Sequence, residues 1–314
     1  MTHLDDERET VATEAFLARR AIDVHVHVTE GGGAAGRDAA SREFQQASAA
    51  VFGSGTQTTV DSVADHYRER DIGAVVFAVD SETATGRTPV PSEEVADLAA
   101  AHGDVLIPFG SVDPWRGQVS LRRIRSLVAE HGVRGFKFHP STQAFYPDDH
   151  RFFPLYAAIE EAGVPVVFHT GQTGMGTGLR GGGGILLKYS NPMHLDEVAA
   201  TFPDLTIIMA HPSVPWQDEG LAVAMHKPNV YIDLSGWSPK YFEPKLVRYM
   251  NRLLTDKVLF GSDYPLISPD RWLRDFAGLD IDDDVRPRIL KDNAVTALGL
   301  VPAAPQTTTG ATTR

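Results

Sequence analysis

The chain has 314 residues, of which 42% are hydrophobic and 22% charged, a composition typical of a globular protein with a sizeable core. Its 29 basic and 41 acidic side chains give a formal net charge of −12, which argues against a general nucleic-acid-binding protein. Cysteine is absent, which excludes disulfides, thiolate metal sites and a cysteine nucleophile. Any metal ion must therefore be held by histidine and carboxylate side chains.

The amino-terminal segment is acidic and lacks the basic-then-apolar order of a secretory signal. No apolar run approaches the roughly 18 residues that a membrane span needs. We therefore expect a cytoplasmic protein that binds neither membranes nor nucleic acid. Residues 1–20 are predicted to form a helical arm, residues 21–300 the main domain, and residues 301–314, rich in Thr, Ala and Pro, a disordered tail.

Eight short apolar runs recur along the chain, and segments typical of helices separate them. Runs that are continuously apolar, rather than alternating, indicate parallel strands buried on both faces. The predicted strands are residues 21–28, 74–79, 105–112, 134–140, 165–170, 205–211, 230–235 and 257–263. Helical stretches between them include residues 91–103, 121–132, 154–163 and 192–203. The pattern predicts an α/β fold, a single (β/α)8 TIM barrel, with a doubly wound open sheet as the alternative.

Long loops are predicted after the first and fifth strands, at residues 29–55 and 171–192. Both leave the carboxyl ends of strands, where the active sites of TIM barrels lie. The second holds eight glycines within residues 171–184, and its cations include Arg180 and Lys188. We expect a lid in which these two cations bind an anionic part of the substrate, with a solvated loop as the alternative.

Ionisable side chains gather at the carboxyl ends of the predicted strands. His25 and His27 share one face of the first strand, and so does Asp23, because side chains alternate with a period of two. His169 ends the fifth strand and Asp263 the eighth. Three imidazoles and one carboxylate that converge are a typical set for one divalent ion, with zinc expected and manganese the alternative. Asp23 is either a partner of this set or a structural carboxylate.

Four motifs, in this order along the chain, resemble a known superfamily. They are D-V-H-V-H at residues 23–27, F-H-T at 168–170, A-H-P at 210–212 and G-S-D-Y-P at 261–265. Over residues 20–300 the chain is similar to the amidohydrolase superfamily, and more closely to its branch of aminocarboxymuconate-semialdehyde and resorcylate decarboxylases. The resemblance implies that His25, His27, His169 and Asp263 bind the metal ion and that His211 is the catalytic histidine. It also implies a homodimer.

Lys137 and His139 share one face of the fourth predicted strand, while the neighbouring phenylalanines share the other. A buried lysine is costly unless it is paired or chemically modified. Other branches of the superfamily carbamylate a lysine on this strand to bridge two metal ions, which is the less favoured alternative here. We expect one metal ion, with Lys137 as a contact of the substrate anion or a buried ion-pair partner. His139 is expected to be a substrate contact in the active site, with a satisfied core histidine as the alternative. Trp237, beyond the seventh strand, is expected either to line the substrate pocket or to pack in the core.

The predicted function is a metal-dependent hydrolase that directs an activated water at a carbonyl of a small to medium anionic, aromatic or acyl-CoA-type substrate. In this hypothesis Asp263 binds the ion and accepts the proton of the water, while His211 stabilises the developing charge. The Gly-rich segment and its cations favour hydrolysis. The first alternative is a non-oxidative decarboxylase of an aromatic or unsaturated carboxylic acid. The second is a barrel that binds metal without catalysis. Asp113 and Asp233, at the ends of the third and seventh strands, are further candidates.

Overall fold

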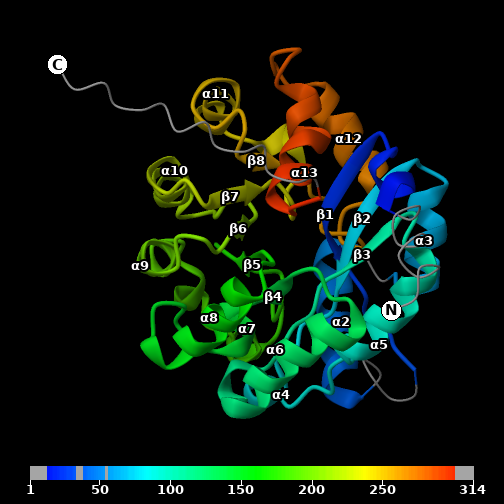
Figure 1. The fold of residues 1–314 in the computed structure, drawn as a ribbon, viewed down its shortest axis with the longest axis vertical. Coiled ribbons are helices and arrows are strands. Elements are labelled where there is room, and N and C mark those ends of the chain that lie inside the picture. The colour runs from blue at the N-terminus through cyan, green and yellow to red at the C-terminus, as the bar shows by residue number, and fades with distance from the viewer. Residues whose placement is uncertain (1–12, 33–37, 54–55, 301–314) are drawn as a thin grey trace.

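Eight parallel strands form the centre of the protein in a computed structural model, which describes residues 13–32, 38–53 and 56–300 (Figure 1). The strands are β1 (Ala21–His27), β2 (Ile72–Phe77), β3 (Leu106–Pro108), β4 (Phe136–Phe138), β5 (Val166–His169), β6 (Ile207–Ala210), β7 (Val230–Asp233) and β8 (Val258–Leu259). Each predicted strand is present in the predicted order, and most are shorter than their apolar runs. The architecture is the predicted α/β barrel.

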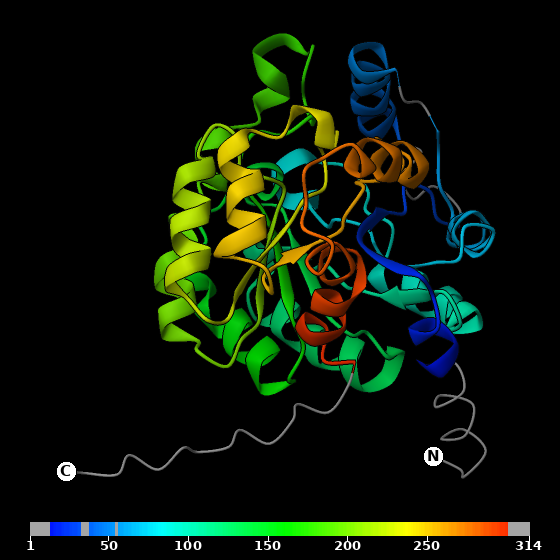
Figure 2. The same cartoon turned by 90° about the horizontal axis from the view of Figure 1, so that it is seen from above.

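Helices surround the strands on the outside, as two views at right angles show, and one further helix, α2, lies apart from them (Figure 1, Figure 2). The helices are α2 (Ala39–Phe52), α3 (Val60–Arg68), α4 (Glu82–Thr85), α5 (Ser92–Ala99), α6 (Gln118–His131), α7 (Pro140–Gln143), α8 (Phe153–Glu161), α9 (His194–Thr201), α10 (Gln217–His226), α11 (Pro244–Arg252), α12 (Pro269–Ala277) and α13 (Asn293–Ala297). Short turns are η1 (Ala100–His102), η2 (Pro114–Arg116), η3 (His150–Phe152), η4 (Arg180–Gly184), η5 (Leu187–Ser190), η6 (Pro239–Tyr241) and the π-helical η7 (Arg288–Asp292).

Each strand pairs with its neighbour in chain order, which gives two ladders, β1–β2–β3 and β4–β5–β6–β7–β8. The ladders are interrupted at two seams, where isolated parallel bridges join Gly110 to Phe136 and Val26 to Tyr264. At the second seam His27 N donates to Tyr264 O at 2.8 Å, and Asp263 N donates to His25 O at 3.0 Å. The backbone of the predicted metal ligands therefore holds this seam together.

Both faces of the strands are buried, as the continuous apolar runs predict. One apolar cluster, which includes Val76 and Phe168, lies between the strands and the helices. A second cluster, which includes Ile22, Val75 and Val167, lies inside the ring of strands. Apolar side chains thus fill the interior below the polar ends of the strands.

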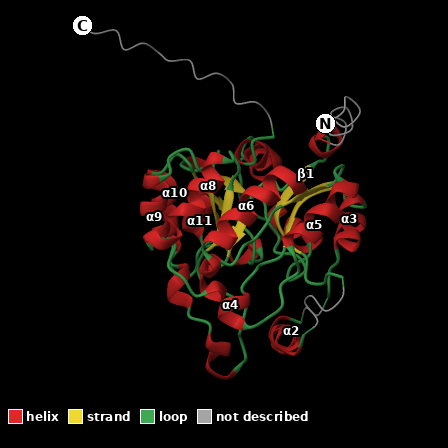
Figure 3. Cartoon of the chain, turned by 60° about the horizontal axis from the view of Figure 1, so that its bottom comes forward, coloured by secondary structure: helices red, strands yellow, loops and turns green. Residues whose placement is uncertain are grey.

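The insertion after β1 is not the predicted loop, because much of it is the helix α2. Asp38 caps this helix and accepts from Ser41 N at 2.9 Å, and Gly53 ends it in the left-handed conformation. The helix lies apart from the ring of helices that covers the strands (Figure 3). The insertion after β5 is irregular apart from η4 and η5, as predicted.

Part of the predicted amino-terminal arm lies within the described residues. Residues 13–17 of the predicted arm are helical, whereas residues 1–12 and the predicted tail 301–314 lie outside the described residues. In the described part of the chain, no helix is both long and apolar enough to cross a membrane.

Asp23 is a structural carboxylate that links β1 to α3 and to the segment after β8. The register of β1 shifts between Asp23 and Val26, so Asp23 does not share the inward face of the histidines as predicted. Its carboxylate accepts from Tyr67 Oη at 2.7 Å, from Ser262 N at 2.9 Å and from His25 N at 3.1 Å. Burial outweighs these hydrogen bonds and raises the pKa of Asp23 to about 7.

We expect Asp23 to make the stability of the protein depend on pH. The pKa is about 7 in the folded state and about 4 in an unfolded chain, so folding takes up a proton between these values. The contribution of Asp23 to the free energy of unfolding is therefore complete below about pH 4 and is lost as the pH rises to about 7.

The variant Asp23→Asn cannot ionise at this position and removes the effect. The free energy of unfolding of the wild type, relative to this variant, should fall by about 3 kcal/mol between about pH 4 and pH 7 in urea denaturation experiments. A difference that stays constant over this range would contradict the assignment.

Candidate metal centre

One cavity of about 1380 Å³ lies at the carboxyl ends of the strands. Its lining includes eight of the predicted site residues, namely His25, His27, Lys137, His139, His169, His211, Trp237 and Asp263. Arg180 and Lys188 are exposed and are not among the described residues that line it. Lys188 lies over the ring of Tyr146 instead, 5.5 Å from its centroid. The structure therefore does not bring the two predicted cations of the Gly-rich segment to the site.

His25, His27 and Asp263 form a tight group of potential metal ligands, with one ligand atom from each within 4.8 Å of the others. Nε2 of His27 is 3.0 Å from Oδ1 of Asp263, and Nε2 of His25 is 3.5 Å from the same oxygen. Ligands about 2.1 Å from an ion with tetrahedral geometry are about 3.4 Å apart. The spacing of these three side chains fits one divalent ion.

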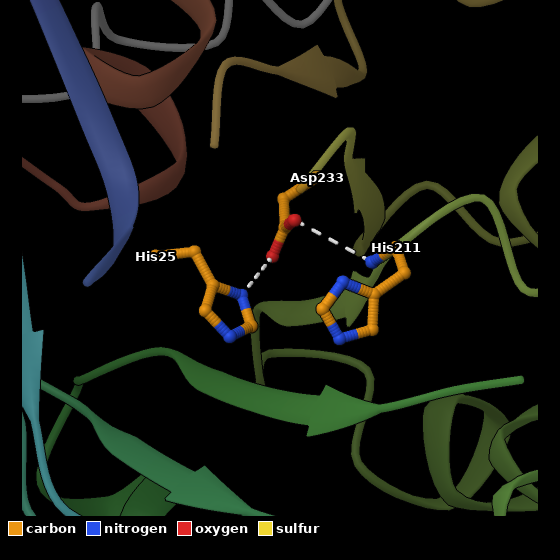
Figure 4. Close-up of side chains that lie close together, drawn as sticks. All are labelled: His25, His211 and Asp233. Carbon is orange, nitrogen blue, oxygen red and sulfur yellow. Dashed lines mark hydrogen bonds and ion pairs between the residues drawn. The ribbon is translucent and has the colours of Figure 1, made fainter. Parts of the chain in front are cut away.

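Asp233 fixes the orientation of His25 (Figure 4). Nδ1 of His25 donates to Oδ2 of Asp233 at 2.9 Å, which leaves Nε2 of His25 as an acceptor. Nζ of Lys137 donates to this Nε2 at 3.2 Å. The lone pair on Nε2 of His25 that accepts this hydrogen bond is the one that would bind a metal ion. The surroundings of Nε2 therefore already favour a positive charge next to it.

His211 is tied to the same carboxylate. Its backbone N donates to Oδ1 of Asp233 at 3.4 Å, as Figure 4 shows. Its Nδ1 lies 2.8 Å from Oγ of Ser235, which in turn donates to Asp233. His25, His211 and Asp233 also have potential ligand atoms within 4.8 Å of one another. We assign these contacts to positioning, because the carboxylate is already engaged by the hydrogen bonds from its neighbours.

His169 lies beside this network but outside the tight group of three. Its Nδ1 is 2.9 Å from Nε2 of His211. Its Nε2 is buried and has no hydrogen-bond partner in the described part of the chain. A buried nitrogen without a partner costs about 1–3 kcal/mol, and a metal ion would satisfy it. The donor chemistry of His169 therefore fits the predicted fourth ligand.

His139 connects the floor of the cavity to the Gly-rich insertion. Its ring stacks on His169 with centroids 3.8 Å apart. Nδ1 accepts from Thr142 N at 3.3 Å, so Nε2 carries the proton and donates to Oγ1 of Thr173 at 3.2 Å. Thr173 belongs to residues 171–192, and the described residues of this insertion that line the cavity are all uncharged.

Burial keeps His25 and His169 neutral, which is the form that binds metal. Burial and then the charge of Lys137 lower the pKa of His25 to about 3, and burial lowers the pKa of His169 well below its usual value. Burial also lowers the pKa of Lys137, although only to about 8, because Asp233 and Asp263 oppose it. Lys137 therefore carries a positive charge at neutral pH.

The two carboxylates of the centre stay ionised. Burial alone would raise the pKa of Asp263, but the hydrogen bond from His27 and the neighbouring histidines hold it well below its usual value. The pKa of Asp233 is likewise lowered, against the effect of burial, by the hydrogen bond that His25 donates and by the nearby charge of Lys137. Both groups can thus act as ligands or hydrogen-bond acceptors over the physiological pH range.

The backbone at the centre is strained. His211 and Asp263 adopt positive φ values of 73° and 68°. For residues other than glycine this conformation costs about 1–3 kcal/mol, and it persists where the surroundings enforce it, often at functional sites. The two residues predicted to be catalytic are thus both held in a rare conformation.

Ser235 is a residue of the centre that the sequence prediction missed. It follows Asp233 by two positions, and this spacing was the available signal, because side chains two apart at a strand end share a face. Asp113, the other carboxylate at a strand end, caps a turn instead, since it accepts from Thr83 N at 2.7 Å and from Trp115 N at 3.0 Å.

The fold and the centre together define a class of protein, the α/β-barrel enzymes that hold a metal ion on histidine and carboxylate side chains at the carboxyl ends of the strands. The model of the amidohydrolase family, Amidohydro_2, matches residues 22–300. The chain belongs to the amidohydrolase family.

Several solved structures are similar to this chain over most of its length. An uncharacterised TIM-barrel protein from Bordetella bronchiseptica is 26% identical, with a TM-score of 0.72 over 89% of this chain and 98% of that one. A 2,6-dihydroxybenzoate decarboxylase from Rhizobium is 14% identical, with a TM-score of 0.64 over 89% and 98%. A 5-carboxyvanillate decarboxylase from Novosphingobium aromaticivorans, complexed with manganese and 4-hydroxy-3-methoxy-5-nitrobenzoic acid, is 17% identical, with a TM-score of 0.61 over 89% and 96%.

One curated relative is similar over a short stretch. Protein fluG from Emericella nidulans is 33% identical over 78 residues, which are 25% of this chain and 8% of that protein. The match thus spans a small part of that relative's length.

Gly236 offers a test of how closely His211 is packed. Gly236 has a φ of 73°, and a Cβ at this position would lie 2.6 Å from Nδ1 of His211. Gly163 has a φ of 66°, and a Cβ there would meet no atom within 4 Å. We expect Gly236→Ala and the matched control Gly163→Ala to share a stability loss of about 1 kcal/mol from backbone strain.

Only Gly236→Ala should move the imidazole signals of His211 and His169 in proton–nitrogen NMR spectra, because it displaces the ring from Ser235. Unchanged signals in Gly236→Ala would contradict the close packing of His211 against Gly236.

Proposed function

We propose that this enzyme is a metal-dependent decarboxylase of aromatic carboxylic acids, the first alternative to hydrolysis. The observation that carries the proposal is the group of His25, His27 and Asp263 at the floor of one cavity, beside the ammonium of Lys137. A floor that combines a metal-binding group with a fixed positive charge suits a carboxylate substrate.

The sequence favours hydrolysis because the cations in residues 171–192 are expected to bind the substrate. The position of these cations does not support that expectation. Arg180 and Lys188 are exposed and do not line the cavity in the described structure. Two of the similar structures are decarboxylases of hydroxylated benzoic acids, which supports the same chemistry here.

His25, His27, His169 and Asp263 would hold the metal ion in this proposal. A bound divalent ion supplies a Lewis acid that fixes and polarises an anionic substrate. Manganese is bound to the similar 5-carboxyvanillate decarboxylase, and the same ligand set also suits zinc. We expect Lys137 to stay unmodified, because a centre that holds one ion needs no bridging ligand.

The reaction adds one proton to the ring carbon that carries the carboxylate. The bond between this carbon and the carboxylate then breaks, its electron pair returns to the ring, and carbon dioxide leaves without a redox step. Lys137 and His139 orient the carboxylate, and Trp237, which lines the same cavity, packs against the ring.

His211 is the acid–base residue of the proposal. Burial lowers its pKa, so its imidazole is neutral at neutral pH. Its Nδ1 contacts Ser235, which donates to Asp233, so a positive charge gained at Nε2 is stabilised by a buried carboxylate. His211 can therefore take up a proton and pass it to the ring carbon.

Metal content and substrate turnover test the proposal together. We expect about one ion per chain by plasma mass spectrometry, and a loss of the ion both in Asp263→Ala and after treatment with a chelator, because one ligand or the ion itself is removed. Carbon dioxide release from a panel of hydroxybenzoates should stop with the loss of metal and return on addition of manganese or zinc. Turnover of esters, amides or lactones without carbon dioxide release from any acid would overturn the proposal.

The variant His211→Asn tests the acid–base role. We expect kcat to fall by about 10²- to 10⁴-fold, because proton transfer loses its positioned group, while the metal content stays unchanged. The control His150→Asn alters an exposed histidine paired with Glu197 and should leave kcat unchanged. A His211→Asn enzyme with wild-type kcat would assign the proton transfer to another group.

The expected homodimer is tested separately by size-exclusion chromatography of the purified protein.

A further inference from the structure

Arg87 lines the cavity from a side that the proposed chemistry does not use. It follows β2 and the short helix α4, and it is partly buried. Its guanidinium lies over the ring of Phe44 on α2, with Cζ 5.0 Å from the ring centroid. Both residues line the same cavity as the metal centre. The sequence carries no signal for Arg87, because it stands alone in a loop.

The hydrogen-bond partners of Arg87 are neutral. Nε donates to Oγ1 of Thr85 at 3.3 Å, and Nη2 donates to Oγ of Ser81 at 3.0 Å. In the described part of the chain its side chain has no carboxylate within ion-pair distance. The charge of Asp38 reaches it, but the oxygens of Asp38 accept from Ser41 N at 2.9 Å and from Thr88 N at 3.1 Å.

Neighbouring arginines behave differently. Arg116 is exposed and pairs with Glu82, and Arg123 pairs with both Asp80 and Glu93 at 2.9 Å. A guanidinium is charged at all physiological pH values, and its burial without an anion is costly. Glu82 and Asp80 are thus paired with other arginines. Arg87 is a fixed positive charge of the cavity that neither of these carboxylates neutralises.

The cavity has room for a ligand that reaches both the metal centre and Arg87. Its volume of about 1380 Å³ exceeds the roughly 300–1,000 Å³ of pockets that hold drug-sized ligands. The planar guanidinium binds a carboxylate through two parallel hydrogen bonds, which neutral hydroxyl partners cannot replace.

We propose that Arg87 binds a second anionic group of the substrate, distinct from the carboxylate that reacts at the metal centre. The substrate class is then an aromatic acid with two anionic groups, such as a dicarboxylate. This inference rests on the proposed function for the identity of the reacting group. Arg87 acts as a specificity-determining residue, and it takes no part in proton transfer.

Binding measurements test this without turnover. Isothermal titration of the metal-loaded protein compares benzoate with benzene-1,3- and benzene-1,4-dicarboxylate. We expect at least one dicarboxylate to bind the wild type about tenfold or more tightly than benzoate. Arg87→Gln should weaken that dicarboxylate roughly 10- to 100-fold and leave benzoate unchanged, while Arg87→Lys should lie between the two.

Controls separate this role from a structural one. Arg116→Gln removes an exposed guanidinium outside the cavity and should change neither affinity. If Arg87 only supports α2, Arg87→Gln will weaken benzoate and dicarboxylate equally, and that result overturns the inference. Equal affinities of the wild type for all three acids overturn it as well. Dicarboxylate selectivity without carbon dioxide release from any acid would refute the proposed function and leave this inference standing.

Discussion

The buried carboxylate of Asp233 is the contact from which the side chains of the metal centre take their orientation. It accepts Nδ1–H of His25 directly, and it holds His211 through both the backbone N and Ser235. Nε2 of His25 is thereby left as an acceptor, which contacts the ammonium of Lys137. Nε2 of His169, whose Nδ1 faces His211, has no hydrogen-bond partner among the described residues. One anion at the end of β7 thus sets the tautomers of side chains from β1, β5 and β6.

The barrel brings these side chains together at one of its two interrupted seams. The ladder is interrupted between β8 and β1, and there the backbone of Asp263 pairs with that of His25. The positive φ of Asp263 turns its carboxylate toward His27 rather than along the strand. Backbone strain and an incomplete ladder thus coincide where the ligands converge, while the apolar clusters on both faces of the strands stabilise the rest of the ring.

The charges of the cavity explain why decarboxylation is the better proposal. The positive charge near the metal ligands comes from Lys137, which is buried on the floor, and a second comes from Arg87 on the wall. The Gly-rich insertion contributes Thr173 to His139 and leaves its own cations exposed. In the proposed function, recognition of the anionic substrate therefore depends on the barrel and on the loop after β2, not on the cations of the Gly-rich insertion.

The sequence alone determined the barrel, the eight strands and the convergence of His25, His27, His169 and Asp263, because buried parallel strands have a continuous apolar signature and their carboxyl ends meet at one rim. It failed where side-chain direction depends on tertiary contacts. The register shift in β1 turns Asp23 toward α3, and the cations of residues 171–192 face solvent. Only the tertiary structure paired Ser235 with His211, because this contact joins segments that are separate in the chain. Only the tertiary structure placed Arg87 in the cavity beside α2, because the local sequence around Arg87 is that of an ordinary loop.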